Sequence, residues 1–243
     1  MPHSQSAVQL QSVEVHRGHR RALIDVSFEI PSGSLTAVVG PNGAGKSSLF
    51  GVLSGRLQAT SGTVRVEGTV AEVLQQTTID SDMPLNVEDI VRMGRFKQRG
   101  LFGRFNARDK QLVDEAIDTM QISNLKRRPI QELSGGQKQR ALVAQGLAQD
   151  SPFLLLDEPT TGLDVPSQAL ITSAMQSSAA AGKTILFSTH DLREAAKADY
   201  LIVLASECIC CAPPIDAFAD PAVTALFSQP TDVVADIGSH ILI

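Results

Sequence analysis

One segment of this 243-residue sequence restricts the possible fold more than any other feature. Residues 40–47 fit the pattern G-x-x-x-x-G-K-[ST] and directly follow the short apolar run Leu35–Val39. The pattern is specific where a strand leads into the glycine loop and a helix follows it. Glycines allow backbone N–H groups to surround phosphate oxygens that a Cβ would keep away. We therefore predict a phosphate-binding glycine loop, residues 40–47, between a strand and a helix.

The glycine loop also carries the side chains that a nucleoside triphosphate requires. Lys46 would neutralise the β and γ phosphates, and the hydroxyl of Ser47 would bind Mg²⁺. A helix that begins at Lys46 would direct the positive end of its dipole at the phosphates. The predicted phosphate-binding residues are Gly40, Pro41, Asn42, Gly43, Ala44, Gly45, Lys46, Ser47 and Ser48.

The hydrophobic pattern of the whole chain predicts an α/β fold. Short apolar runs predict buried strands of a parallel sheet at Leu35–Val39, Phe153–Leu156 and Thr184–Ser188. Helical periodicity is present at Lys46–Leu53 and over residues 109–120 and 135–149. Alternating polarity predicts antiparallel strands over residues 8–16, 27–30, 62–66 and 70–74. These segments together indicate a mixed-sheet core with an antiparallel β subdomain and an inserted helical subdomain.

We expect a single domain over residues 1–243. Its core would occupy about residues 8–76 and 150–214, and the helical subdomain about residues 77–149. After Ala212 the chain contains Pro213, Pro214, Pro221 and Pro230, with short apolar pieces between them, and it ends in the tail, residues 215–243. This tail is compatible with packing on the core, with extension toward a partner and with mobility.

Composition and charge argue against several classes of protein. The sequence is 43% apolar and 19% charged, which is ordinary for a globular protein and disfavours disorder. It has 21 basic and 26 acidic residues, one tyrosine and no tryptophan, so it lacks the charge and aromatic platforms typical of nucleic-acid binding. No apolar run approaches the roughly eighteen residues of a membrane span, and we expect no secretory signal. The clustered Cys208, Cys210 and Cys211 favour a reducing compartment and packing in a strand.

Two acidic residues follow the apolar run Phe153–Leu156. Ligands of open α/β sheets bind at the carboxyl ends of strands, where Asp157 would emerge. Its carboxylate would hold Mg²⁺, usually through water, because this ion keeps much of its hydration shell. Glu158 is placed to polarise an attacking water. The alternative of a simple acidic turn is disfavoured by the glycine loop in the same chain.

A further segment predicts a second helix start that can bind an anion. We refer to Leu133, Ser134, Gly135, Gly136 and Gln137 as the signature segment. Ser134 has the chemistry of a helix N-cap, and the glycines permit close backbone approach. Taken alone, the segment is equally compatible with an ordinary capped helix.

These segments, in this order, resemble the nucleotide-binding subunit of an ATP-binding-cassette (ABC) transporter over about residues 8–214. The resemblance implies catalytic roles for Lys46, Glu158, His190 and the Q-loop glutamine Gln75, with Gln76 as the alternative. It also implies that Asp164 belongs to the D-loop that contacts nucleotide, and that Ser47, Gln75 and Asp157 contact the metal.

The sequence departs from the family pattern at two informative positions. The family usually places an aromatic residue against adenine, whereas this sequence has His16 and Arg17, either of which could stack on a base. Gly146 replaces a common alanine within the helix that follows the signature segment. A glycine there lowers helix stability by about 1 kcal/mol relative to alanine.

In the family, two subunits enclose two ATP molecules, and the glycine loop of one faces the signature segment of the other. The resemblance therefore implies a head-to-tail homodimer that uses ATP and Mg²⁺ and does not bind nucleic acid. It implies a peripheral location on the cytoplasmic face of the membrane, on integral-membrane permease subunits, with an extracytoplasmic solute-binding protein in the same system. The alternative is a soluble ABC ATPase without a permease, such as one that assists iron–sulfur cluster assembly.

One stretch suggests the cargo. Residues 82–84, Met93-Gly94-Arg95 and residues 99–104 resemble the ATPase subunits of manganese, zinc or iron importers, and haem and siderophore importers share part of this stretch. The same region contains a basic cluster: Arg92, Arg95, Lys97, Arg99, Arg104 and Arg108. We interpret the cluster either as a solvated helix face or loop or as a docking surface for the permease.

Overall fold

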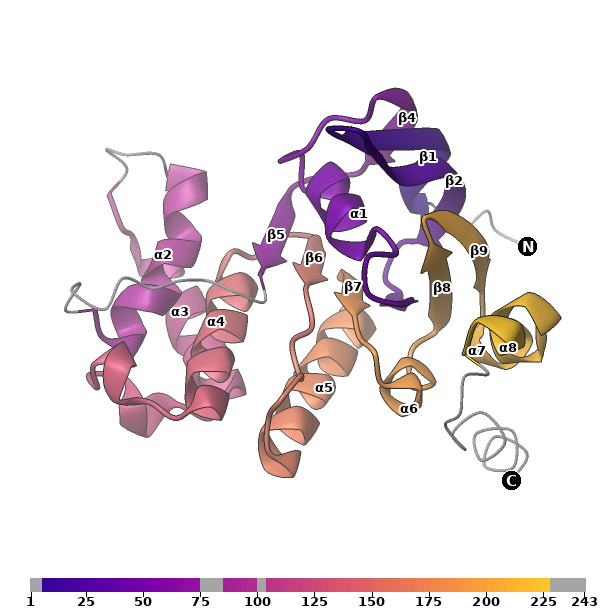
Figure 1. Ribbon diagram of the computed structural model, residues 1–243. Coiled ribbons are helices and arrows are strands. Elements are labelled where there is room, and N and C mark those ends of the chain that lie inside the picture. The colour runs from indigo at the N-terminus through magenta and orange to yellow at the C-terminus, as the bar shows by residue number, and fades with distance from the viewer. Residues whose placement is uncertain (1–5, 75–84, 100–103, 228–243) are drawn as a thin grey trace.

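The computed structural model describes residues 6–74, 85–99 and 104–227. Its strands form two sheets, which adjoin each other on the right of Figure 1. The six-stranded sheet has the order β5 (Val70–Val73), β6 (Phe153–Leu156), β7 (Thr184–Ser188), β3 (Leu35–Val39), β8 (Tyr200–Ala205) and β9 (Glu207–Ala212). The three-stranded sheet has the order β2 (Arg20–Pro31), β1 (Ser6–Arg17) and β4 (Ser61–Val66).

The six-stranded sheet contains the predicted parallel core. Strands β5, β6, β7, β3 and β8 pair in parallel, and β9 pairs antiparallel with β8. All residues of β3, β6 and β7 are buried, because side chains on both faces of these strands are covered. Their continuous apolar sequence reflects this burial. The mixed sheet and the bounds of these three strands confirm the prediction.

The antiparallel subdomain is confirmed for three of its four predicted strands. Strand β1 pairs antiparallel with both β2 and β4. The prediction for residues 70–74 was wrong, since β5 pairs in parallel with β6. Strand β5 is the edge of its sheet and buries Ala71 and Val73 more deeply than Val70 and Glu72. An edge strand with unequal faces shows the alternation of an antiparallel strand.

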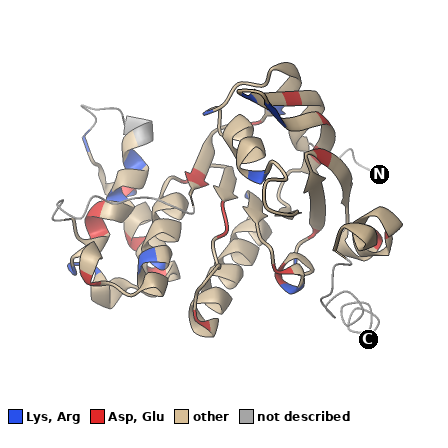
Figure 2. Ribbon diagram, viewed as in Figure 1, with Lys and Arg blue, Asp and Glu red and all other residues tan. Residues whose placement is uncertain are grey.

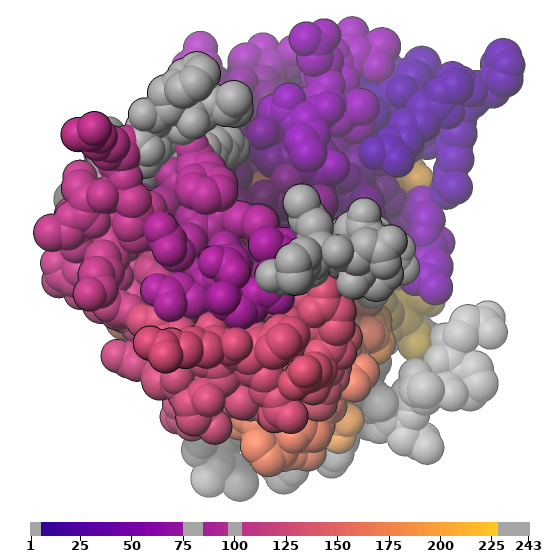
Figure 3. Space-filling view, turned by 90° about the vertical axis from the view of Figure 1, so that its left-hand side faces the viewer, coloured from indigo at the N-terminus to yellow at the C-terminus, as the bar shows by residue number. Residues whose placement is uncertain are grey.

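Helices pack around and beside these sheets. Those of the core and of the described tail are α1 (Lys46–Leu53), α5 (Val165–Ala180), α6 (Leu192–Ala195), α7 (Pro214–Ala219) and α8 (Pro221–Phe227). The helical subdomain contains α2 (Val87–Arg99), α3 (Ala107–Thr119) and α4 (Gly135–Ala148), and it lies on the left of Figure 1. It faces the viewer in Figure 3. Helix α4 contacts β5 and β6 and so connects this subdomain to the core.

Two glycines allow helix α4 to approach its neighbours. A Cβ at Gly94 of α2 would lie 2.3 Å from the carbonyl oxygen of Gln145. A Cβ at Gly146 of α4 would lie 2.4 Å from Cγ2 of Val73 and 3.2 Å from Cδ1 of Leu154. Both glycines are therefore required by packing, which outweighs the helix propensity lost at Gly146.

Replacing Gly146 with alanine should destabilise the protein although alanine favours helix. The added methyl group meets the stiff side chain of Val73, and we expect a net loss of roughly 1–2 kcal/mol. Urea unfolding of Gly146→Ala beside Gly135→Ala measures this effect, because an added Cβ at Gly135 meets no described atom within 4 Å. The double variant Gly146→Ala/Val73→Ala should recover part of the loss. Stability equal to wild type in Gly146→Ala would disprove the packing argument.

The structure corrects the interpretation of the basic cluster as a surface, because one of its members is buried. The guanidinium of Arg95 is buried, with Nε donating to Oδ1 of Asp109 at 2.9 Å and Nη1 donating to the carbonyl oxygens of Ala148 and Gln149, each at 2.9 Å. Arg95 thus joins α2 to the start of α3 and the end of α4 and is not part of a surface. Arg92 lies over the ring of Phe105 at 4.4 Å.

The described side chains of the remaining members, Arg104 and Arg108, do not form a surface of positive charge alone. Arg104 and Arg108 are exposed, and Arg108 lies 3.7 Å from the carboxylate of Asp150. The side chains of Lys97 and Arg99 lie outside the described residues, as do residues 82–84. Figure 2 shows acidic as well as basic positions on the helical subdomain.

The three cysteines lie on β9, as the strand prediction requires. Burial raises the pKa of Cys208 from 9.0 to about 12 and that of Cys211 to about 11, and it also raises the pKa of Cys210.

The tail contacts this part of the sheet, because α7 packs on β8 and β9 and α8 packs on β9. Packing on the core is therefore the correct alternative for the tail as far as Phe227. Among the described helices, none combines the length and the apolar character of a membrane span.

The raised pKa values predict how the thiols titrate. In the folded protein the thiolate absorbance of Cys208 and Cys211 near 240 nm should increase around and above pH 11, whereas in urea it should increase near pH 9. A pKa that folding raises contributes stability that is present below pH 9 and is lost as the pH rises toward 12. Complete titration of Cys208 and Cys211 between pH 8 and 10 in the folded protein would contradict their burial.

Candidate functional site

The glycine loop connects β3 to α1 in the predicted order. Gly45 precedes α1 with φ of 102°, a left-handed conformation that favours glycine. A Cβ there would lie 2.4 Å from the carbonyl oxygen of Ala22 and 2.7 Å from Cδ2 of Leu23. The loop can therefore lie against strand β2 only with glycine at this position.

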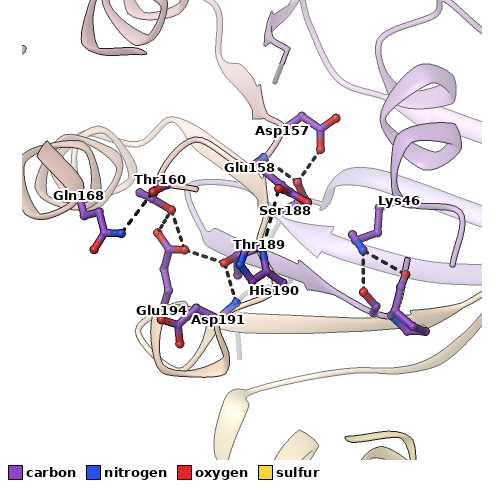
Figure 4. A network of polar contacts seen from close by, with 12 residues as sticks. Lys46, Asp157, Glu158, Thr160, Gln168, Ser188, Thr189, His190, Asp191 and Glu194 are labelled. Carbon is purple, nitrogen blue, oxygen red and sulfur yellow. Dashed lines mark hydrogen bonds and ion pairs between the residues drawn. The ribbon is translucent and has the colours of Figure 1, made fainter. Parts of the chain in front are cut away.

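Lys46 is held over the glycine loop by backbone carbonyls. Its Nζ donates to the carbonyl oxygen of Gly40 at 2.6 Å and to that of Pro41 at 3.2 Å (Figure 4). Partial burial lowers the pKa of Lys46, and the negative charges of Glu158 and Asp157 partly oppose this shift. These contacts hold the ammonium group at the loop, and Lys46 lines the same cavity as the two carboxylates.

Asp157 and Glu158 follow β6 and meet the end of β7. The Oγ of Ser188 donates to Oδ1 of Asp157 at 2.6 Å and accepts from the backbone N–H of Glu158 at 2.8 Å (Figure 4). Glu158 has φ of 47°, which is uncommon for a residue other than glycine. Such a conformation is typical of functional sites, where the surrounding structure maintains it.

His190, for which the resemblance implies a catalytic role, lies beside Glu158. Its Nδ1 is 3.9 Å from Oε2 of Glu158, and 65% of its side chain is exposed. A group of hydrogen bonds holds the adjoining segments together (Figure 4). The hydroxyls of Thr160 and Thr189 both donate to the carboxylate of Glu194, at 2.8 Å and 2.7 Å. Helix α6 is thereby attached to the segments that follow β6 and β7.

A cavity of about 300 Å³ unites the predicted phosphate and acid residues. The glycine loop from Asn42 to Ser47 lines it together with Ser48, Asp157 and Glu158. Two arginines also line it, Arg17 and Arg20. Of the two candidates for contact with a base, Arg17 therefore lies at this cavity, whereas Nε2 of His16 lies 3.6 Å from the carboxylate of Glu14.

Sequence reasoning missed two residues of this site. Nη2 of Arg20 donates to the carbonyl oxygen of Gly43 at 2.7 Å and so supports the glycine loop from β2. Ser188 contacts both acidic residues, as described above. The position of Ser188, two residues before His190 at the end of an apolar strand, was the available signal; no comparable pattern indicated Arg20.

The signature segment lies beside the D-loop of its own chain. Ser134 caps α4, because its Oγ accepts from the N–H of Gln137 at 3.3 Å while the side chain of Gln137 accepts from the N–H of Ser134 at 3.0 Å. A Cβ at Gly136 would lie 2.7 Å from Oγ of Ser167 and 3.0 Å from Oδ1 of Asp164. Leu133 is buried. None of these residues lines the cavity that is lined by the glycine loop of the same chain.

The donor set of the cavity fits a magnesium ion. Ser47 is exposed and offers a hydroxyl, and Asp157 offers a carboxylate at the same cavity. These are hard oxygen ligands of the kind that Mg²⁺ prefers. Gln75, the third predicted ligand, and Gln76 lie outside the described residues.

Comparisons with known proteins identify the family of this chain. The sequence profile described as "ABC transporter" matches residues 23–161. The manganese transport system ATP-binding protein MntB of Halalkalibacterium halodurans is 37% identical over 225 residues, which are 89% of this chain and 90% of that protein. The hemin import ATP-binding protein HmuV of Streptomyces coelicolor is 37% identical over 235 residues, which are 91% of this chain and 83% of that protein.

The fold has equally clear counterparts among solved structures. The inward-facing structure of a putative metal-chelate type ABC transporter matches with a TM-score of 0.84 and 28% identity, over 93% of this chain and 90% of that chain. The glycine loop, the capped signature segment, the acid pair after β6 and the histidine after β7 occur in one fold and in the expected order. The chain therefore belongs to the ABC transporter family, as one of its ATP-hydrolysing ATP-binding subunits.

Proposed function

We propose that this subunit hydrolyses ATP to drive the import of a transition-metal ion, such as manganese, zinc or iron, or of a metal chelate. The observation that carries this proposal is the single cavity lined by the glycine loop, Lys46, Asp157 and Glu158. The relatives named for manganese transport and hemin import, and the metal-chelate transporter structure, support the cargo class.

Each residue of the site has a role in this proposal. The N–H groups of the glycine loop and the ammonium group of Lys46 bind the phosphates. Ser47 and Asp157 would hold Mg²⁺, which would neutralise charge on the phosphates. Glu158 accepts a hydrogen bond from the attacking water and orients it toward the γ-phosphate, which His190 contacts. No covalent protein intermediate is required, because positioning and charge stabilisation suffice for phosphoryl transfer.

Two further contacts complete the nucleotide site. The planar guanidinium of Arg17 stacks on adenine, in the place where the family usually has an aromatic side chain. The signature segment of a second copy covers the phosphates, with Ser134, Gly135, Gly136 and Gln137 presenting a helix N-terminus and Asp164 beside it. The location of the signature segment away from its own cavity supports this arrangement.

The transport role requires partners. We infer that a dimer of this chain docks on integral-membrane permease subunits at the cytoplasmic face of the membrane, and that an extracytoplasmic solute-binding protein supplies the cargo. A soluble ABC ATPase without a permease is the alternative. The names of the relatives, which are transport and import proteins, favour the transport role.

Copurification and metal content distinguish the two roles. A tagged chain expressed in its own cell should copurify from detergent-solubilised membranes with a protein of several membrane spans. Deletion of the gene should lower cellular manganese, zinc or iron in limiting medium. Glu158→Gln should copurify normally but should not restore the metal content. A chain that occurs only in the soluble fraction, in cells with unchanged metal content, would contradict the transport role.

A further inference from the structure

Ser188 makes two hydrogen bonds that join the two acidic residues of the site. It is the last residue of β7 and is fully buried, and it lies across from the end of β6. A hydroxyl has one proton to donate and two lone pairs to accept with. Ser188 donates its proton to Oδ1 of Asp157 and accepts from the N–H of Glu158. One small side chain thus contacts both carboxylate-bearing residues.

Each of these hydrogen bonds restrains a group to which we assign a role in hydrolysis, namely the carboxylate of Asp157 or the backbone of Glu158. The bond to Oδ1 fixes the orientation of the Asp157 carboxylate at the cavity. The bond from the N–H of Glu158 restrains a backbone with φ of 47°, from which the Glu158 side chain projects. Loss of the hydroxyl would free the carboxylate to rotate and would leave a partly buried N–H without its acceptor.

We propose that Ser188 is a positioning residue for ATP hydrolysis, which acts through Asp157 on the metal and through the backbone of Glu158 on the attacking water. This inference rests on the roles proposed above for Asp157 and Glu158. Groups that orient metal-binding carboxylates commonly change metal affinity or activity by about 10–100-fold when they are removed. We expect an effect of this size on kcat.

The same strand provides a matched control. Thr184 begins β7, is 3% exposed and uses its hydroxyl to accept from the N–H of Gly33 at 3.0 Å. Its substitution removes a buried hydroxyl and the hydrogen bond that this hydroxyl accepts from the N–H of Gly33, at the end of β7 away from the acidic residues. Thr184→Val therefore measures what general weakening of the strand does to turnover.

Steady-state kinetics test the first part of the proposal. Ser188→Ala should lower kcat for ATP by about 10–100-fold at saturating Mg²⁺, and KM should rise by a smaller factor, because the glycine loop and Lys46 still bind the phosphates. Ser188→Cys, which has similar size and a weak donor, should give a smaller loss, and Ser188→Thr, which keeps the hydroxyl, should retain most of kcat. Thr184→Val should keep kcat within about twofold. If Ser188→Ala does not fold, the comparison of Ser188→Cys with Ser188→Thr decides.

A binding measurement without turnover tests the action through the metal. In a Glu158→Gln background, ATP with EDTA and ATP with Mg²⁺ should each raise the melting temperature, since bound ligand stabilises the folded state. Ser188→Ala added to this background should keep the rise with ATP and EDTA but lose much of the additional rise that Mg²⁺ produces. A residue that only stabilised the strand would not change this difference.

The results that overturn the proposal are distinct. Normal kcat in Ser188→Ala and Ser188→Cys, or an equal loss of kcat in Thr184→Val, would show that the two hydrogen bonds do not position the acids. If the additional rise in melting temperature with Mg²⁺ is unchanged in Ser188→Ala, Ser188 does not act on the metal through Asp157. Absence of hydrolysis by the wild-type protein would contradict the proposed roles of Asp157 and Glu158 themselves, and the positioning role with them.

Discussion

Glu158→Gln should bind ATP and hydrolyse it at least about 100-fold, and up to about 10⁴-fold, more slowly than wild type. Glutamine keeps the size of the side chain and can still form hydrogen bonds, but it lacks the negative charge that orients the attacking water. Nucleotide binding depends on the glycine loop and Lys46, so affinity for ATP should be retained. Phosphate release and equilibrium ATP binding measure the two effects separately.

The slow variant should also accumulate as an ATP-bound dimer in size exclusion with light scattering. A matched control is Glu132→Gln, in which the same change occurs at an exposed carboxylate that pairs with Arg128 at 3.3 Å. This variant should hydrolyse ATP normally. If Glu158→Gln retained rapid hydrolysis, the proposed role of Glu158 would pass to another residue of the cavity.

Arg95→Met should cause the largest loss of stability, about 3–5 kcal/mol. The substitution removes the charged partner of Asp109, which is fully buried, and withdraws two hydrogen bonds from the carbonyls at the end of α4. A loss of this size is large against the total stability of about 5–15 kcal/mol typical of folded proteins. Urea unfolding, followed by circular dichroism, measures it.

Arg92→Met provides the control on the same helix. The guanidinium of Arg92 lies over Phe105 without the buried partners of Arg95, so its loss should cost less than about 1 kcal/mol. Failure of Arg95→Met to fold would agree with the expectation. Equal stability of the two variants would show that the Arg95–Asp109 pair contributes no more to stability than the half-buried Arg92 does.

The sequence was sufficient for the parts of the fold that local pattern determines. The apolar runs that became β3, β6 and β7 are buried on both faces, so their composition alone indicated strands of a parallel core. The glycine loop and the cap at Ser134 depend on residue types at fixed spacing, and both formed as predicted. The family resemblance, rather than any spacing, indicated His190.

The remaining features depend on contacts between distant segments. Strand β5 alternates in polarity because it is an edge strand, and the sequence does not reveal which sheet an alternating strand joins. Arg95 lies among other basic residues, and only the packing of α2 against α3 and α4 shows that it is buried. The sequence shows only that Gly146 lowers helix propensity, whereas the structure shows that Val73 leaves no room for a Cβ at this position. Arg20 and Gly43 are 23 positions apart in the sequence, so no local motif contains both residues.

Complementation between two inactive variants tests most directly the claim that the glycine loop and the signature segment of different copies form one ATP site. Lys46→Ala damages the loop, and Ser134→Arg damages the signature segment, so each homodimer has two defective sites. A mixed dimer has one site with both defects and one site with none. Equimolar mixing with subunit exchange, verified by two affinity tags, should therefore restore ATP hydrolysis.

The control for this experiment follows from the cavity. Lys46 and Glu158 of one chain line the same cavity, so a mixed dimer of Lys46→Ala and Glu158→Gln has a defect in both of its sites. This mixture should remain inactive while the mixture of Lys46→Ala and Ser134→Arg recovers hydrolysis. No recovery in the second mixture despite proven exchange, or equal recovery in both, would contradict an ATP site shared between two copies of this chain.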